Sequence, residues 1–194
     1  MHGFKTSQGD IQDIFKFVPN DNLQMTENQF EFAHMQNGNI WILTKRHHLI
    51  WKAPLDSLSD RRGGAKINEL DEDILKNKPI KKMYVDARGL HCFFLAEHEI
   101  YYNHWNSNRV YQITTRTDNS AQPKSFRSLD LSYVSPGDYD IFEILVGTED
   151  GQIYHACLNF SPGKNTLDYL DTLKNVFETG DYRPILDLKI AKIG

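Results

Sequence analysis

The chain has 194 residues, 40% of them hydrophobic, and carries 22 Lys and Arg against 26 Asp and Glu, a formal net charge of -4. This balance supplies no excess of cations to neutralise phosphates or anionic lipid, so the sequence predicts no nucleic-acid partner. The N-terminus has no apolar leader-like run, and no stretch approaches the roughly 18 apolar residues of a membrane-spanning helix. Cys92 and Cys157 are too few for a disulfide framework. These features predict a soluble, cytosolic globular protein with two buried free thiols.

Segments rich in β-branched and aromatic residues dominate the chain and fall into groups separated by turn dipeptides such as Asn37-Gly38. The predicted strands are residues 30–35, 40–44 and 49–53, then 80–85, 90–96, 100–104 and 109–114, then 126–134, 141–147 and 152–158. Residues 166–177 fit either a helical face or an outer strand, and we favour the strand. A further β-rich segment opens at residue 185.

The groups repeat at an interval of roughly 50 residues. Trp51, Tyr101 and Tyr154 each follow an isoleucine at the start of a third strand. Three or four antiparallel strands per repeat are typical of propeller blades. The sequence therefore predicts an all-β fold, a partial β-propeller of about three to four antiparallel blades.

The predicted domain is one N-terminal propeller portion over residues 1–194. Its blades are expected at about residues 11–55, 80–115 and 126–178, with the next starting at 185–194. A propeller is stable because its blades close into a ring, and rings contain about four to eight blades. We therefore expect this chain to be part of a larger propeller, of about seven blades. A β-sandwich of about ten strands is the alternative.

The stretch "ILVGTEDGQIYHACL" (144–158) gathers two carboxylates, a histidine and a cysteine. Glu149 and Asp150 invite comparison with the acid pair of glycosidases, but catalytic acids need burial or a charged neighbour, which a hairpin tip is not expected to supply. Asp150-Gly151 between two strands predicts a tight turn instead. Cys157 and His155 share a strand face, yet nothing identifies an orienting third group or an oxyanion site.

The remaining polar groups give no catalytic, metal or cofactor-binding residue. The histidines at 47, 48, 91, 98, 104 and 155 lack converging zinc-ligand spacings, and we expect strand placement to scatter them over opposite faces and separate strands. The basic clusters at 44–48, 60–66 and 80–82 lie near acids and are interpreted as solvated turns. No nucleotide-binding glycine pattern occurs. Trp41, Trp51, Tyr101, Tyr102 and Trp105 are expected to pack mainly between blades.

The order of several motifs resembles one known family. They are "IFKFVP" (14–19), "IWILTKRHHLIWKAPL" (40–55), "IKKMYVDARGLHCFFL" (80–95), "EIYYNHW" (99–105), "EILVGTEDGQIYHACL" (143–158) and "ILDLKI" (185–190). Together they resemble the N-terminal propeller of the deep orange family of class C vacuolar-sorting proteins, from about residue 11 to residue 190.

The resemblance implies a non-enzymatic subunit of the HOPS and CORVET tethering complexes, which bridge endosomal, lysosomal or vacuolar membranes before fusion. It implies other class C subunits as partners, a cytoplasmic location peripheral to those membranes, and no cofactor or small-molecule substrate. Full-length family members continue into an α-solenoid and a RING-type zinc domain, and these 194 residues contain neither. Zinc binding is therefore not carried over.

Two other functions stay open. One is a generic cytosolic propeller adaptor of the WD-repeat type, although no Trp-Asp dipeptide occurs. The other is a propeller hydrolase, which needs acids or metal ligands converging on the central channel. For a scaffold, the inter-strand stretches 55–79 and 115–125 are the expected partner-contact surfaces, because loops on a rigid frame commonly carry binding.

Overall fold

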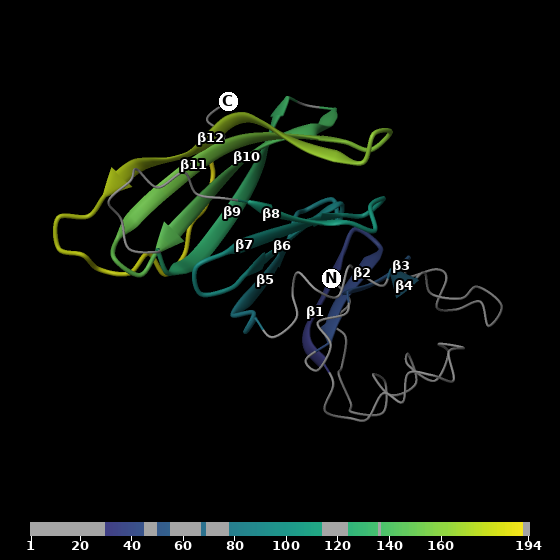
Figure 1. Ribbon diagram of the computed structural model, residues 1–194, viewed down its shortest axis with the longest axis horizontal. Helices are drawn as coiled ribbons and strands as arrows, with labels where there is room; N and C mark the ends of the chain where they lie inside the picture. Colours follow the sequence, from purple (N-terminus) through teal and green to yellow (C-terminus); the bar gives the residue numbers. More distant parts are fainter. Residues whose placement is uncertain are drawn as a thin grey trace. The chain divides into compact units, whose positions relative to one another are not determined.

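The computed structural model describes residues 30–44, 50–54, 67–68, 78–113, 124–135 and 137–191. The chain divides into two compact units, Met1–Lys76 and Asn77–Gly194. The described residues form strands and turns without a helix, in three separate four-stranded sheets (Figure 1). In each sheet, strands that follow one another in sequence are neighbours. This order confirms the predicted all-β fold of propeller-type antiparallel sheets, because a two-layer sandwich would mix these segments within shared sheets.

The first unit contains one sheet. Its strands are β1 (Phe30–Gln36), β2 (Asn39–Thr44), β3 (Ile50–Pro54) and β4 (Ile67–Asn68). Asn37 and Gly38 have φ values of 49° and 75°, which confirms the predicted two-residue turn, since such hairpins need positive φ at both central residues. The short β4 lies inside the stretch 55–79, which was expected to contain no strand, and that expectation is wrong for these two residues because Ile67 pairs with Trp51.

The second sheet begins the second unit. Its strands are β5 (Lys82–Val85), β6 (His91–Leu95), β7 (Ile100–His104) and β8 (Val110–Ile113). Every residue of β6 and β7 is buried. Strands buried on both faces lose the alternation of polar and apolar residues. This burial explains why "HCFFL" and "IYYNH" read as nearly continuous aromatic and aliphatic runs.

The third sheet has the longest strands. They are β9 (Phe126–Ser135), β10 (Asp138–Thr148), β11 (Gln152–Ser161) and β12 (Thr166–Glu178). In β11 the burial alternates residue by residue, as expected for a strand with one core-facing side. The 13-residue β12 confirms the strand over the helix at 166–177. Tertiary pairing with β11 decides this outcome, because the sequence pattern fitted both.

The second and third sheets share one hydrophobic core. The second sheet contributes Phe93, Leu95, Ile100, Tyr102 and Ile113, and the third contributes Phe126, Leu129, Phe142, Ile144, Val146, Tyr154, Ala156, Leu158, Phe160 and Leu173. The neighbouring sheets β5–β8 and β9–β12 are visible in Figure 1 in teal and in green to yellow. Alternate side chains of β10 and β11 therefore bury one face of the third sheet against the second.

Residues 182–191 form no strand. They still make main-chain contacts with the third sheet: the Ile185 N–H donates to the Thr148 carbonyl at 3.0 Å, and Ser128 Oγ donates to the Ile185 carbonyl at 2.8 Å. A Cβ on Gly147 would lie 2.5 Å from an Ile185 side-chain atom, so glycine permits this close approach. The start of a further blade at 185, like the other blade limits, stays a prediction.

Candidate interaction surface

Four ion pairs line one end of the second and third sheets. We call these eight residues the charged rim: Lys78 with Glu99, Lys81 with Glu97, Lys124 with Asp150, and Arg127 with Glu149. The acids lie at the tips of two hairpins, β6–β7 and β10–β11. Three of the cations lie just before β5 or β9, and the fourth, Arg127, is the second residue of β9. The side chains are roughly one-fifth to one-half exposed, so the rim meets solvent with alternating charges.

Residues 124–127 hold the two hairpin tips together. The Phe126 N–H donates to the Glu97 carbonyl at 3.0 Å, and the Glu149 N–H donates to the Ser125 carbonyl at 2.9 Å. His98 Nδ1 donates to the Lys124 carbonyl, which lies 3.0 Å away. One short segment therefore fixes the spacing between both tips through its own main chain.

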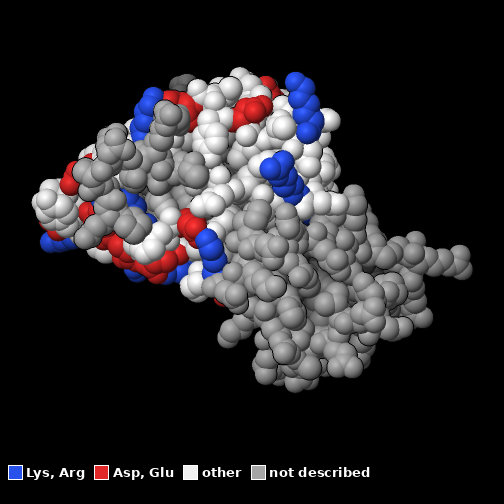
Figure 2. Space-filling model, in the orientation of Figure 1, with Lys and Arg blue, Asp and Glu red and all other residues white. Residues whose placement is uncertain are grey.

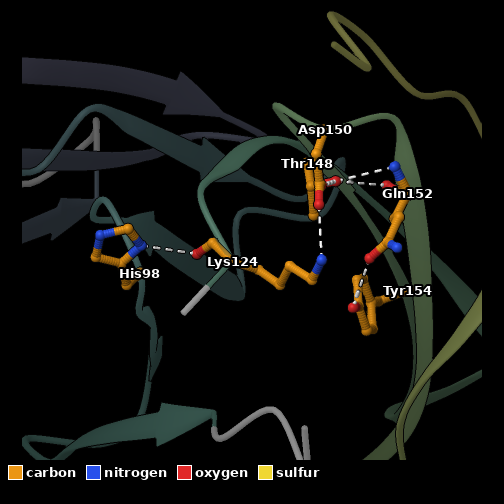
Figure 3. A network of polar contacts seen from close by, with 6 residues as sticks. All are labelled: His98, Lys124, Thr148, Asp150, Gln152 and Tyr154. Atoms are coloured by element: carbon orange, nitrogen blue, oxygen red, sulfur yellow. Dashed lines mark hydrogen bonds and ion pairs between the residues drawn. The ribbon is translucent and has the colours of Figure 1, made fainter. Parts of the chain in front are cut away.

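Figure 3 shows how the β10–β11 tip orients Asp150. Lys124 Nζ donates to Asp150 Oδ2 at 2.6 Å, while the Thr148 hydroxyl donates to Asp150 Oδ1 and accepts the Gln152 N–H at 2.9 Å. Gly151 follows with a φ of 83°. The predicted turn at Asp150-Gly151 is confirmed, and the carboxylate forms part of its scaffold.

Three of the rim carboxylates, Glu97, Glu99 and Asp150, have lowered pKa values. Hydrogen bonds from Lys81 and Ser125 lower the pKa of Glu97. Burial alone raises the pKa of Glu99, but hydrogen bonds from Lys78 and Tyr101 outweigh it, and the net pKa is lowered. The pKa of Asp150 is lowered in the same way, against the effect of burial, by Lys124 and Thr148. At neutral pH this rim therefore presents fixed charges of both signs.

This geometry corrects one sequence-based expectation about Glu149 and Asp150. A hairpin tip was expected to supply no charged neighbour, yet Arg127 pairs with Glu149 at 2.6 Å and Lys124 pairs with Asp150 at 2.6 Å. The cations come from 22 and 26 residues earlier in the chain, and only the fold brings them close. Because a general acid needs a raised pKa, the lowered pKa of Asp150 favours an ion-pair role.

His91 and His104 lie on separate strands, as expected, but they lie side by side on one face of the sheet, which corrects the expectation of opposite faces. His91 and His104 are direct partners across β6 and β7, both buried, with ring centroids 5.1 Å apart. His98 lies on the rim, and His155 Nε2 is 3.8 Å from Glu143 Oε1. Among the described residues, no group of three or more His, Cys, Asp or Glu could hold a metal ion. His47 and His48 lie outside the described residues.

His91 links the second sheet to the third. Its Nε2 lies 2.7 Å from the Tyr139 carbonyl in β10 and must carry the proton, because a carbonyl only accepts. Its Nδ1 therefore accepts from the Tyr102 hydroxyl at 2.8 Å. Burial lowers the pKa of His91, which agrees with this neutral ring. The histidine is thus a structural bridge between sheets.

Cys157 lies in β11 two residues from His155, and its thiol is not activated. Burial, followed by the nearby charges of Glu143 and Asp171, raises the pKa of Cys157. A raised pKa lowers the thiolate fraction and with it nucleophilicity. The same Glu143 is the ionic neighbour of His155. These contacts do not favour a thiolate nucleophile at Cys157.

We expect Cys157 to react more slowly with a thiol reagent at pH 8 than a free cysteine does, and Glu143→Gln to accelerate it. The substitution removes a negative charge, so the pKa falls and more thiolate forms. The measurement is the labelling rate in a Cys92→Ala background, which leaves one thiol. Asp138→Asn, at the start of β10, is the control with the same charge change. Equal rates for Glu143→Gln and the parent would contradict this account.

Other predicted features have mixed outcomes. Trp41, Tyr101 and Tyr102 are fully buried. Of these, Tyr102 belongs to the core between the second and third sheets, as expected for packing between blades. Burial, and then Glu99, raises the pKa of Tyr101 to about 12. The basic clusters at 45–48 and 60–66, and most of the expected contact stretches at 55–79 and 115–125, lie outside the described residues. Those contact surfaces stay predictions.

The charged rim and the face around it carry charges of both signs. On the face that Figure 2 shows, the described Lys and Arg lie among Asp and Glu. A phosphate-binding surface needs clustered cations, and the rim cations are matched one to one by acids. The charge pattern is therefore suited to a protein surface with a complementary alternation of charges.

The three meander sheets, the buried interface between two of them and the ion-paired hairpin tips define a β-propeller portion of the kind that presents rims and loops for binding. A family model described as the Pep3/Vps18/deep orange beta-propeller domain matches residues 17–194. The chain belongs to this family of vacuolar-sorting propellers. A search of curated proteins finds no match.

One solved structure agrees with the fold. The complex of the fission yeast SREBP-SCAP binding domains aligns with a TM-score of 0.55 and 11% identity, over 95% of this chain and 45% of that chain. The WD40 domain of SCAP from fission yeast gives a TM-score of 0.48 and 10% identity, over 78% of this chain and 32% of that one. The chain thus spans less than half the length of these relatives. At such identities the first likeness shows the fold alone.

Proposed function

We propose that this chain is a non-enzymatic propeller scaffold of a vacuolar-sorting tethering complex. Its partners are other class C subunits, and it acts in membrane tethering, fusion and vesicle-mediated transport at endosomes, lysosomes or vacuoles. It reaches those membranes from the cytoplasm, through the complex. The family match over residues 17–194 carries this proposal. Among the described residues no helix is long and apolar enough to cross a membrane.

The charged rim is the surface through which we expect this scaffold to dock a subunit. Its side chains sit on a rigid frame, because residues 124–127 bond both hairpin tips through the main chain. A prearranged pattern of charges lowers the ordering cost of association and sets the register of a partner. Half-exposed ion pairs contribute only about 0–1 kcal/mol each to folding, so the rim can be altered without unfolding the sheets.

The test is co-purification of class C subunits with the chain expressed in cells. We expect Glu97→Lys combined with Glu149→Lys to reduce recovery about tenfold, since reversed charges face a complementary partner surface. Lys164→Glu, in the exposed turn between β11 and β12, is the matched control and should keep recovery unchanged.

Two results would count against the proposal. If the rim variant recovers class C subunits as fully as the unaltered chain does, the charged rim is not the docking surface. If the unaltered chain recovers no class C subunit, the tethering function itself is rejected. Thermal unfolding of each variant, expected within a few degrees of the parent, separates lost docking from lost folding.

A further inference from the structure

Exposed apolar side chains concentrate on the outer strand of the third sheet. Six of the eight large hydrophobic residues exposed among the described residues belong to β12 or to the segment after it. They are Tyr169, Leu170, Val176, Phe177, Tyr182 and Leu186, and we call the first four the β12 strip. Leu170 and Val176 are each 56% exposed. Exposed apolar groups gathered in this way mark interaction sites.

The strip lies on an edge strand. β12 pairs with β11 on one side, and in the described part of the chain no strand lies on its other side. It is 13 residues long and contains no proline. Edge strands of natural proteins are usually short or interrupted, because a row of unpaired N–H and C=O groups recruits another strand. This edge therefore offers main-chain pairing together with apolar side chains.

The charges near the strip favour a basic ligand. Lys174 pairs with Asp171 at 2.5 Å, and Arg183 pairs with Asp181 at 2.8 Å, so these cations are already neutralised. Toward the two ends of β12, the exposed Asp168 and Glu178 form no ion pair with another described residue. Lys124, whose charge interacts with that of Glu178, is itself paired with Asp150. A bound segment with lysine or arginine near its ends would complement these acids, and an acidic one would be repelled.

We propose that the outer edge of β12 binds an extended basic segment of a partner protein as a fifth strand of the third sheet. Main-chain hydrogen bonds supply affinity, and alternate apolar side chains of the segment pack on Leu170 and Val176. The site differs from the charged rim in position and chemistry. It goes beyond the proposed function, because it holds for any partner that carries such a segment.

The probe is a fluorescent peptide of about eight residues that alternates valine and threonine between terminal lysines, a length typical of strands. Anisotropy gives its Kd for the 194-residue chain, and hydrogen exchange reports on the β12 amides. A peptide N-methylated at alternate residues has the same charge, but it lacks the N–H groups needed for main-chain hydrogen bonds with β12. Leu170→Thr with Val176→Thr removes the apolar contacts, and Val134→Thr, an exposed valine at 45% in β9, is the matched control.

We expect N-methylation to weaken binding about tenfold or more, because it removes main-chain hydrogen bonds of the ladder. We expect a similar loss for the double variant, because it removes both apolar anchors. Val134→Thr should bind as the parent does, and the bound peptide should slow exchange in β12. Absence of binding, equal affinity of the N-methylated peptide, or an unaffected double variant overturns the proposal. A dimer in sedimentation that the double variant dissolves assigns the edge to a second copy instead. Peptide binding does not depend on class C subunits, so its failure is distinguishable from failure of the tethering function.

Discussion

Asp86→Ala is expected to destabilise the second unit by about 3 kcal/mol or more, because it leaves four donors, one buried and three partly buried, without this acceptor. Asp86 is 8% exposed, in the turn between β5 and β6. Its Oδ1 accepts the N–H groups of Leu90 and His91 at 2.7 and 2.6 Å. Its Oδ2 accepts the Arg88 N–H at 2.8 Å and the Tyr133 hydroxyl from β9.

The Asp86 turn therefore stabilises both its own hairpin and the contact between the second and third sheets. It closes the β5–β6 hairpin around its own main chain, and through Tyr133 it reaches the third sheet. His91 makes the second inter-sheet bond, to the Tyr139 carbonyl. Losing Asp86 frees the His91 main chain and weakens the positioning of its ring, so both connections suffer together.

Urea unfolding checks this prediction, with two graded controls. Tyr133→Phe removes one hydroxyl and should cost about 1 kcal/mol. Asp86→Asn keeps one acceptor oxygen and should fall between Tyr133→Phe and Asp86→Ala. If Asp86→Ala cost no more than Tyr133→Phe, the turn would not depend on this side chain, and our account of the network would be wrong.

Phe142→Ala is the second large expected effect, a loss of about 3–5 kcal/mol in the free energy of unfolding. Phe142 is fully buried in β10. Its ring centroid lies 4.4 Å from that of His91, 5.6 Å from Tyr102 and 6.1 Å from Phe93. The truncation opens a cavity at the centre of the interface between the sheets, lined by rings that are held by both strands and hydrogen bonds.

The matched control is Phe142→Leu, which keeps most of the volume and should cost about 1.5 kcal/mol or less. Because Phe93 faces Phe142 across the interface, Phe93→Ala with Phe142→Ala should give a non-additive loss in a double-mutant cycle. Strictly additive losses would mean that the two sheets do not pack through these rings.

Strand positions in this chain follow from local patterns. Alternating β-branched and aromatic residues, together with turn dipeptides, predicted ten strands that the structure contains. Asn37-Gly38 and Asp150-Gly151 predicted their turns because positive φ is accessible to few residues. The short β4 escaped detection, because two residues are too few to show a period. The choice of strand for 166–177 needed the pairing with β11.

The candidate surfaces were much harder to predict. Glu97 and Glu149 read as ordinary turn residues, since their cations lie 16 and 22 residues earlier in the chain. The β12 strip could not be predicted from the sequence either, because Leu170 and Val176 have the same apolar character as buried residues nearby. Exposure depends on strand order and on twist, which the local sequence does not record.

By itself the sequence determined the fold class, the strand periodicity, most turns and the family resemblance, because backbone preferences and side-chain alternation act over a few neighbouring residues. Only the tertiary structure decided which acids are paired, that His91 joins two sheets, and which strand edge is exposed. These properties arise from contacts between residues far apart in the chain. Their energies depend on distance and burial, which exist only after folding.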